Sequence, residues 1–115
     1  MNKSYDIVVI GAGLSSLMFL SRYIINNKDQ SILLIEKDAN KNINQTFCVW
    51  QGPGLIDIKN TYNLKPKHVW SKVEVSNEGL SIQRDISPYS YECFDGKETL
   101  SKLLSQCKKN ITYRE

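Results

Sequence analysis

The chain of 115 residues can form one domain with a modest core, and its 41% hydrophobic and 23% charged residues are typical of a globular protein. Its net charge of +3 is small and its lysines are scattered, so we expect no nucleic-acid partner. Three cysteines without a CxxC pair and a single histidine argue against zinc, and we expect no metal site.

The first third of the chain has the order strand, glycine-rich turn, helix, strand and acid. We predict a strand from Tyr5 to Ile10, a helix from about Leu14 to Asn26, and a second strand from Ser31 to Glu36. The first strand has the apolar run that is typical of a sheet covered on both faces. This order predicts a parallel βαβ unit that binds a dinucleotide.

The glycine-rich turn and the acid supply the candidate site. Gly11 permits the tight turn, and Gly13 lets the backbone approach a pyrophosphate at the helix N-terminus. Glu36 can accept hydrogen bonds from ribose hydroxyl groups, and its charge disfavours the 2′-phosphate of NADP. The motif's sixth residue is Ser16, where glycine or alanine is usual. The candidate cofactor-binding residues are Gly11, Ala12, Gly13, Leu14, Ser15, Ser16, Glu36 and Lys37.

Residues 37–95 predict an inserted loop and antiparallel strands. A polar loop over 38–43 follows the second strand, and we predict a helical turn over Leu55 to Tyr62. The alternation from Val69 to Val75 predicts a half-buried strand, with a hairpin partner from Leu80 to Arg84. An extended segment follows at Pro88–Phe94.

Residues 96–115 predict a helix and then a third parallel strand at Ile111–Tyr113, beside the first or the second strand. The fold class is therefore α/β: the N-terminal part of a Rossmann-like FAD-binding domain with an antiparallel insertion. Because simple NAD domains cross over with a single helix, the insertion favours FAD. The chain ends inside a predicted strand, so we expect a longer protein.

With these elements placed, the sequence resembles the lycopene cyclase family, flavoproteins of carotenoid synthesis. The turn Gly11–Leu14 with its two following serines is similar to that family's opening. Residues Asn44–Phe47 are similar to its Asn-His-Thr-Trp segment, with Gln45 and Phe47 as departures. His68-Val69-Trp70 resembles its His-x-Trp pair.

The resemblance implies an isomerase of the intramolecular-lyase kind. Such an enzyme closes the ends of lycopene, or of a related acyclic carotenoid, with reduced FAD and no net redox change; NAD(P)H would be the reductant. In the family the proton donor lies beyond residue 115, so no catalytic residue is predicted and the chain alone is expected to be inactive. The expected location is cytoplasmic, peripheral to the inner membrane. Alternatives are another FAD-dependent oxidoreductase, such as a hydroxylase or isoprenoid reductase, or a non-catalytic dinucleotide-binding domain.

Several residues after the second strand have two interpretations. Thr46, Phe47 and Trp50 border the flavin or the polyene, or they form core between domains, since buried aromatic residues usually only pack. His68 is a proton carrier or a structural residue. Trp70 lines an apolar tunnel or covers a sheet edge.

Overall fold

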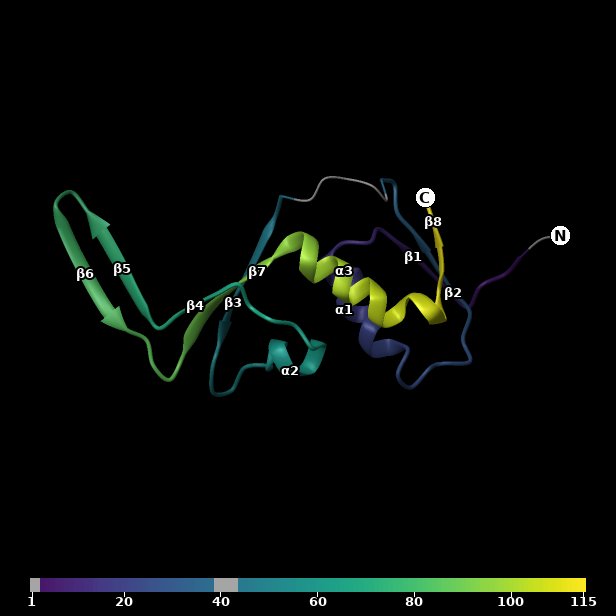
Figure 1. Ribbon diagram of the computed structural model, residues 1–115, viewed down its shortest axis with the longest axis horizontal. Helices are drawn as coiled ribbons and strands as arrows, with labels where there is room; N and C mark the ends of the chain where they lie inside the picture. The colour runs from purple at the N-terminus through teal and green to yellow at the C-terminus, as the bar shows by residue number, and fades with distance from the viewer. Residues whose placement is uncertain (1–2, 39–43) are drawn as a thin grey trace. The chain divides into compact units, whose positions relative to one another are not determined.

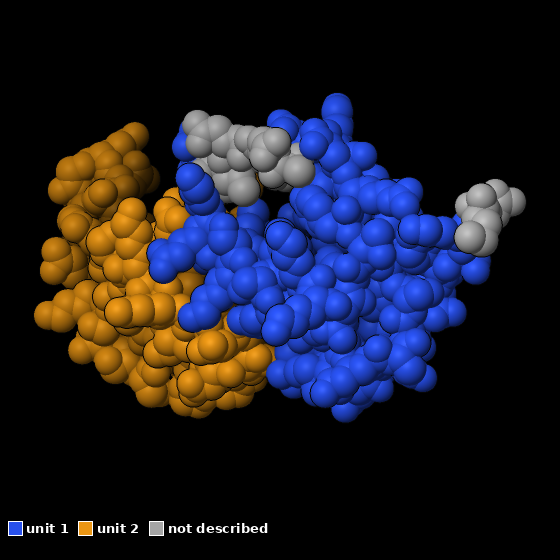
Figure 2. Space-filling model, turned by 45° about the vertical axis from the view of Figure 1, so that its right-hand side comes forward, with its two compact units in different colours: residues 1–44, 97–115 blue, residues 45–96 orange. Residues whose placement is uncertain are grey.

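The computed structural model describes residues 3–38 and 44–115. It has mixed helices and strands (Figure 1), and the chain divides into two compact units. Unit 1 comprises residues 1–44 and 97–115, and unit 2 comprises residues 45–96 (Figure 2). Most of the predicted polar loop, residues 39–43, lies outside the described residues.

Unit 1 contains a parallel sheet of three strands. Strand β1 (Ile7–Ile10) pairs with β2 (Ile32–Ile35), which pairs in turn with β8 (Thr112–Arg114). The strand order is therefore β1-β2-β8, and the third strand lies beside the second. The predicted parallel βαβ arrangement and the return of the chain as a third parallel strand are confirmed.

Two helices connect these strands. Helix α1 (Leu14–Tyr23) runs between β1 and β2, while α3 (Gly96–Cys107) and the short 3₁₀ helix η1 (Lys108–Asn110) precede β8. Helix α1 ends earlier than predicted. The side chain of Asn27 donates a hydrogen bond to the carbonyl of Tyr23 (N···O 2.8 Å), which satisfies a free carbonyl of the last turn.

Apolar residues cover only one face of the parallel sheet among the described residues. Ile32 and Leu34 of β2 are buried, whereas Val8 and Ile10 of β1 are 52% and 82% exposed. The expectation that both faces of the first strand are covered is therefore wrong, because the packed side chains gather on the other face. The buried apolar residues of unit 1 are Ala12, Leu17, Leu20, Ile24, Ile32, Leu34, Leu100, Leu103 and Cys107.

Unit 2 contains an antiparallel sheet of three strands with β7 (Ser90–Asp95) at its centre. Its neighbours are β3 (Thr46–Gln51) and β4 (His68–Trp70). The short helix α2 (Ile58–Tyr62) lies between β3 and β4 in the chain. Asp57 is its N-cap, and the carboxylate of Asp57 accepts a hydrogen bond from the N–H of Asn60. The predicted antiparallel insertion is confirmed in this sheet.

A two-stranded hairpin completes unit 2. Strands β5 (Lys72–Asn77) and β6 (Leu80–Asp85) pair across Glu78 and Gly79 (Figure 1). Both turn residues have positive φ, 45° and 84°, as a type I′ hairpin turn requires. The predicted hairpin is confirmed.

The single half-buried strand predicted from Val69 to Val75 is wrong. The chain breaks at Ser71, so that its two halves become β4 and β5, which pair with different strands. Val69 and Val75 are 55% and 69% exposed. The alternation described the local backbone correctly, but pairing partners decided where the strand was divided and which side chains were covered.

Candidate functional site

The predicted dinucleotide turn lies at the carboxyl end of β1. Gly11 has a φ of +96°, a conformation that L side chains rarely adopt, and its N–H donates to the carbonyl of Ile35 (2.7 Å). This bond continues the pairing of β1 with β2 by one residue. Gly11 therefore turns the chain out of the sheet while its N–H stays satisfied.

Glu36 is held against this turn. Its Oε2 accepts a hydrogen bond from the N–H of Ala12 (2.6 Å), and its Oε1 accepts one from the N–H of Asp38 (3.3 Å). The N–H of Glu36 itself donates to the carbonyl of Arg114 in β8 (2.8 Å). Only 7% of Glu36 is exposed. The structure thus brings together the turn and the acid that sequence analysis named 24 residues apart.

Gly13 is the N-cap of α1, and no side chain caps the helix there. Its φ of −83° is open to any residue, and a Cβ added at this position would meet no atom within 4 Å. The first turn of α1 carries no acidic residue. Backbone N–H groups at such a helix start, with the positive end of the helix dipole, can bind an anion.

The remaining candidate residues surround this turn. Ser15 and Lys37 are exposed, and Leu14 and Ser16 are partly buried. Across the sheet, burial raises the pKa of Tyr113, and the charges of Glu36 and Glu115 raise it further. The charge of Glu36 is therefore felt at the neighbouring strand β8.

Unit 2 presents a row of aromatic side chains on one face of its antiparallel sheet. Trp50, Tyr91 and Trp70 occupy directly paired positions on β3, β7 and β4. The ring centroids of Trp50 and Tyr91 are 4.9 Å apart, those of Tyr91 and Trp70 6.1 Å, and those of Trp70 and His68 5.5 Å. The two tryptophans are 50% and 44% exposed, so part of each ring is open to a ligand.

Sequence analysis named both tryptophans and His68 separately and missed the role of Tyr91, which joins them. Successive side chains of a strand point to opposite faces, so Tyr91 and its neighbour Glu92 lie on different faces of β7. The sequence of β7 shows no clear alternation of apolar and polar residues, and the strand partners were needed to complete the row.

Within residues 3–38 and 44–115, no group of three or more histidine, cysteine, aspartate or glutamate side chains could hold a metal ion. None of the helices in this described part is both long and apolar enough to cross a membrane. Cys48, Cys93 and Cys107 are free thiols.

Comparison with known proteins does not assign this chain to a family. Neither a search against models of protein families nor a search of curated proteins gives a match to this sequence. The family resemblance therefore stays a prediction that depends on the residues quoted for it.

Proposed function

We propose that unit 1 binds the ADP part of FAD and that the chain is the flavin-binding part of an enzyme resembling lycopene cyclases. The observation that carries this proposal is the hydrogen bond between the turn residue Ala12 and Glu36, at the carboxyl ends of two parallel strands. Ligands of open parallel sheets bind at these ends, with the pyrophosphate at the glycine-rich turn. The strand order, with β8 beside β2, suits a Rossmann-like sheet.

The glycine at position 13 is evidence for a ligand at the turn, because neither the backbone conformation nor the packing of the protein requires a glycine at Gly13. Any residue adopts its φ of −83°, and no atom within 4 Å would meet a Cβ. Gly11 differs, since its positive φ explains its glycine through the fold alone. The open space at Gly13 suits a pyrophosphate that approaches the N-terminus of α1.

Glu36 supports a ribose without a 2′-phosphate. Its two oxygens each accept a backbone N–H, and a carboxylate oxygen can accept more than one hydrogen bond, so a ribose hydroxyl group can donate to the same carboxylate. A phosphate group beside this carboxylate would be repelled. FAD and NAD fit this condition, and the insertion of residues 45–96 between β2 and β8 favours FAD.

The proposed substrate is lycopene or a related acyclic carotenoid. The half-exposed rings of Trp50 and Trp70, joined through Tyr91, form a row of aromatic side chains against which a conjugated chain could pack. Ring closure leaves the atom count of the carotenoid unchanged, so bound reduced flavin would supply charge stabilisation without net electron transfer. Within this chain, residues 11–16 and Glu36 would hold and orient the cofactor.

Binding is tested by titrating the ¹⁵N-labelled chain with ADP, which carries the ribose and pyrophosphate, and recording amide shifts by NMR. We expect shifts at residues 11–16 and 36–37, and none in the hairpin at residues 72–85. ADP that carries an additional 2′-phosphate should bind about tenfold more weakly through repulsion by Glu36. Gly13→Val should remove the ADP shifts. Shifts that survive in Gly13→Val, or that are absent from the turn in the unmodified chain, would contradict the site.

The chemistry is tested in the complete protein. An anaerobic assay contains lycopene, reduced FAD and a measured amount of reductant. We expect a cyclic carotene with no stoichiometric consumption of reductant. Consumption of one reductant per product would favour a reductase, and dependence on oxygen with its insertion into the product would favour a hydroxylase. Flavin binding without conversion of lycopene would favour a non-catalytic domain.

A further inference from the structure

A buried carboxylate in unit 2 has no role in the proposed dinucleotide site. Glu92 lies on the central strand β7 and is 1% exposed. Its Oε2 lies 3.4 Å from the hydroxyl of Ser90, whereas its Oε1 has no hydrogen-bond partner. Among the buried side-chain nitrogen and oxygen atoms of the described residues, this Oε1 alone lacks one. A buried carboxylate oxygen without a donor is costly, so its surroundings bear on function.

Glu92 lines a pocket of about 370 Å³ that is formed entirely by residues of unit 2. This volume is near the lower end of the range of roughly 300–1,000 Å³ for small-molecule sites. Apolar side chains and polar groups both face it. The apolar walls are Pro53, Leu55, Ile56 and Pro88, and the polar groups include Lys59, Ser90 and Glu92.

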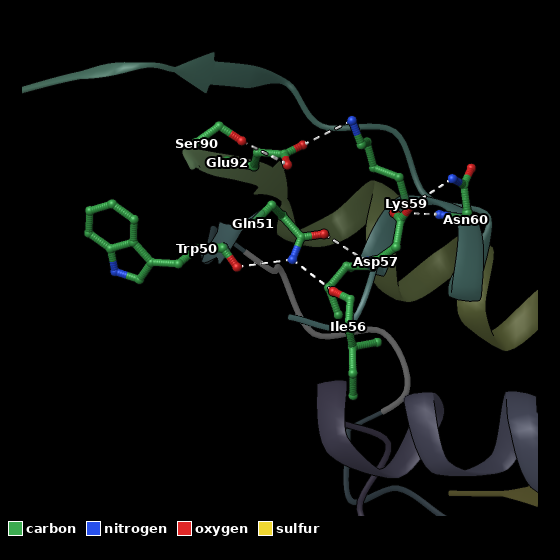
Figure 3. A network of polar contacts seen from close by, with 9 residues as sticks. Trp50, Gln51, Ile56, Asp57, Lys59, Asn60, Ser90 and Glu92 are labelled. Carbon is green, nitrogen blue, oxygen red and sulfur yellow. Dashed lines mark hydrogen bonds and ion pairs between the residues drawn. The ribbon is translucent and has the colours of Figure 1, made fainter. Parts of the chain in front are cut away.

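Gln51 is one of the residues that line this pocket, and Figure 3 shows its hydrogen bonds. Its side-chain amide donates to the carbonyls of Trp50 (2.9 Å) and Ile56 (2.8 Å), and its Oε1 accepts from the N–H of Ile58 (2.8 Å). Both amide hydrogens and the amide oxygen of this buried residue are thus engaged with the backbone. The loop that carries the apolar wall is therefore tied to β3 and to the start of α2.

The charges around the pocket limit the ligand that it can take. Lys59 Nζ lies 3.6 Å from Glu92 Oε1, too far for a hydrogen bond, and the lysine side chain is 46% exposed. Asp57 also lines the pocket, but its carboxylate is engaged with Asn60, whose N–H (3.2 Å) and side chain (2.6 Å) donate to it. An anionic ligand would face the carboxylate of Glu92, and a cationic ligand would face the ammonium group of Lys59.

We propose that this pocket binds a small uncharged alcohol. Its hydroxyl group donates a hydrogen bond to Glu92 Oε1 and accepts one from Lys59, and its hydrocarbon part packs against the apolar wall. A hydroxyl group is both donor and acceptor, so it satisfies the carboxylate and the ammonium together. An ammonium group only donates, and a carboxylate only accepts. The site is independent of the proposed FAD site because all its residues belong to unit 2.

The test uses three probes with the same ring: cyclohexanol, cyclohexylammonium and cyclohexanecarboxylate. Each is titrated into the unmodified chain, and the ¹³C resonance of the Glu92 carboxylate and the amides around the pocket are followed by NMR. We expect cyclohexanol to shift these signals and to bind about tenfold more tightly than either charged probe, because only the alcohol satisfies both groups. Equal binding of the three probes, or no shift of the Glu92 resonance with cyclohexanol, would overturn the proposal.

Two variants test whether Glu92 and Lys59 are responsible for the preference for cyclohexanol. Glu92→Met removes the acceptor at similar size and should weaken cyclohexanol binding about tenfold. Lys59→Met should reverse the order of the probes, so that cyclohexylammonium binds more tightly than cyclohexanol. Glu74→Gln, at an exposed glutamate of the hairpin, is the matched control and should leave the order unchanged. An unchanged order in Lys59→Met would refute the role of charge. If Glu92→Met does not fold, the probe series on the unmodified chain still decides.

Discussion

Units 1 and 2 each bury a glutamate, Glu36 and Glu92, which are exposed by 7% and 1%. Glu36 accepts backbone hydrogen bonds on both oxygens, from the N–H groups of Ala12 and Asp38. Glu92 Oε1 accepts none and has only the ammonium group of Lys59 at 3.6 Å. The same side chain therefore stabilises the backbone in unit 1, while in unit 2 its desolvation is recovered only in part.

This difference indicates that a protein can retain a buried charged residue for two reasons, the stability of the fold and the binding of a ligand. At Glu36, stability and ligand binding are coupled, because the carboxylate that would meet a ribose also holds the turn. At Glu92 they are separable, because Oε1 of this pocket residue has no hydrogen bond to lose. Substitutions that affect one property and spare the other can distinguish the two cases.

The largest expected effect comes from placing methionine at each glutamate. Glu36→Met should lower the free energy of unfolding by about 1–3 kcal/mol, because the N–H of Ala12 loses its buried acceptor. Glu92→Met should be neutral or stabilising, since a methionine of similar size avoids the desolvation of the carboxylate. Urea unfolding followed by circular dichroism measures both. A loss at Glu92 as large as that at Glu36 would show that the two carboxylates are equally well satisfied.

The two glycines of the turn give the next contrast. Gly11→Ser should lower the free energy of unfolding by about 1–3 kcal/mol, because serine is strained at a φ of +96°. Gly13→Ser should raise it by roughly 0.3 kcal/mol, since serine is a better N-cap for α1, yet it should weaken ADP binding by filling the turn. Denaturation and ADP titration of both variants check this. Unimpaired ADP binding in Gly13→Ser would remove the functional reason for glycine there.

A smaller effect is expected from the cation beside Glu92. Lys59→Met should lower the free energy of unfolding by about 1 kcal/mol or less, because the lysine is half exposed but is the nearest cation to a buried charge. The double variant Lys59→Met/Glu92→Met should recover this loss. A double-mutant cycle measured by urea unfolding gives the coupling between the two residues. Additive effects would mean that the pair does not interact.

The smallest effect concerns alkaline pH. Burial raises the pKa of Cys107 above its ordinary value of 9.0. The unfolded chain loses this proton first, so stability is fully present below about pH 9 and is lost as the pH rises through the folded-state pKa. Cys107→Ala should flatten the fall in the free energy of unfolding between about pH 8 and 11. Leu103→Ala makes a cavity nearby without a titrating group and should leave the slope unchanged; equal slopes in both variants would exclude Cys107 as the cause.

Local signals were sufficient for much of the fold. The apolar runs at Ile7–Ile10 and Ile32–Ile35, with a glycine-rich turn and a helix between them, predicted the βαβ unit. The alternating residues before Asn77-Glu78-Gly79 and the segment Leu80–Arg84 after it predicted the hairpin, and the positive φ of Glu78 and Gly79 is a finding of the structure. Gly11, Ala12 and Glu36 could likewise be grouped from spacing, since parallel strands place their carboxyl ends at one edge of a sheet.

The pairing of strands that lie far apart in the sequence could not be predicted from such local signals. Residues 69–75 alternate as one strand does, but β7 pairs with the first half and β6 with the second. Similarly, the apolar run of β1 does not reveal that Val8 and Ile10 are exposed. Which face is covered depends on the elements that pack against it, and those lie far away in the sequence.

The sequence by itself determined the βαβ unit, the hairpin and the grouping of Gly11, Ala12 and Glu36, because each depends on backbone preferences or on one short crossover. Only the tertiary structure decided that β8 lies beside β2, that Tyr91 joins two tryptophans, and that Glu92 is buried in a pocket. A glutamate in a strand looks solvent-facing in sequence. Its burial arises from the sheet β3-β7-β4 and from the loop that Gln51 ties down, which are contacts between segments that local preferences do not encode.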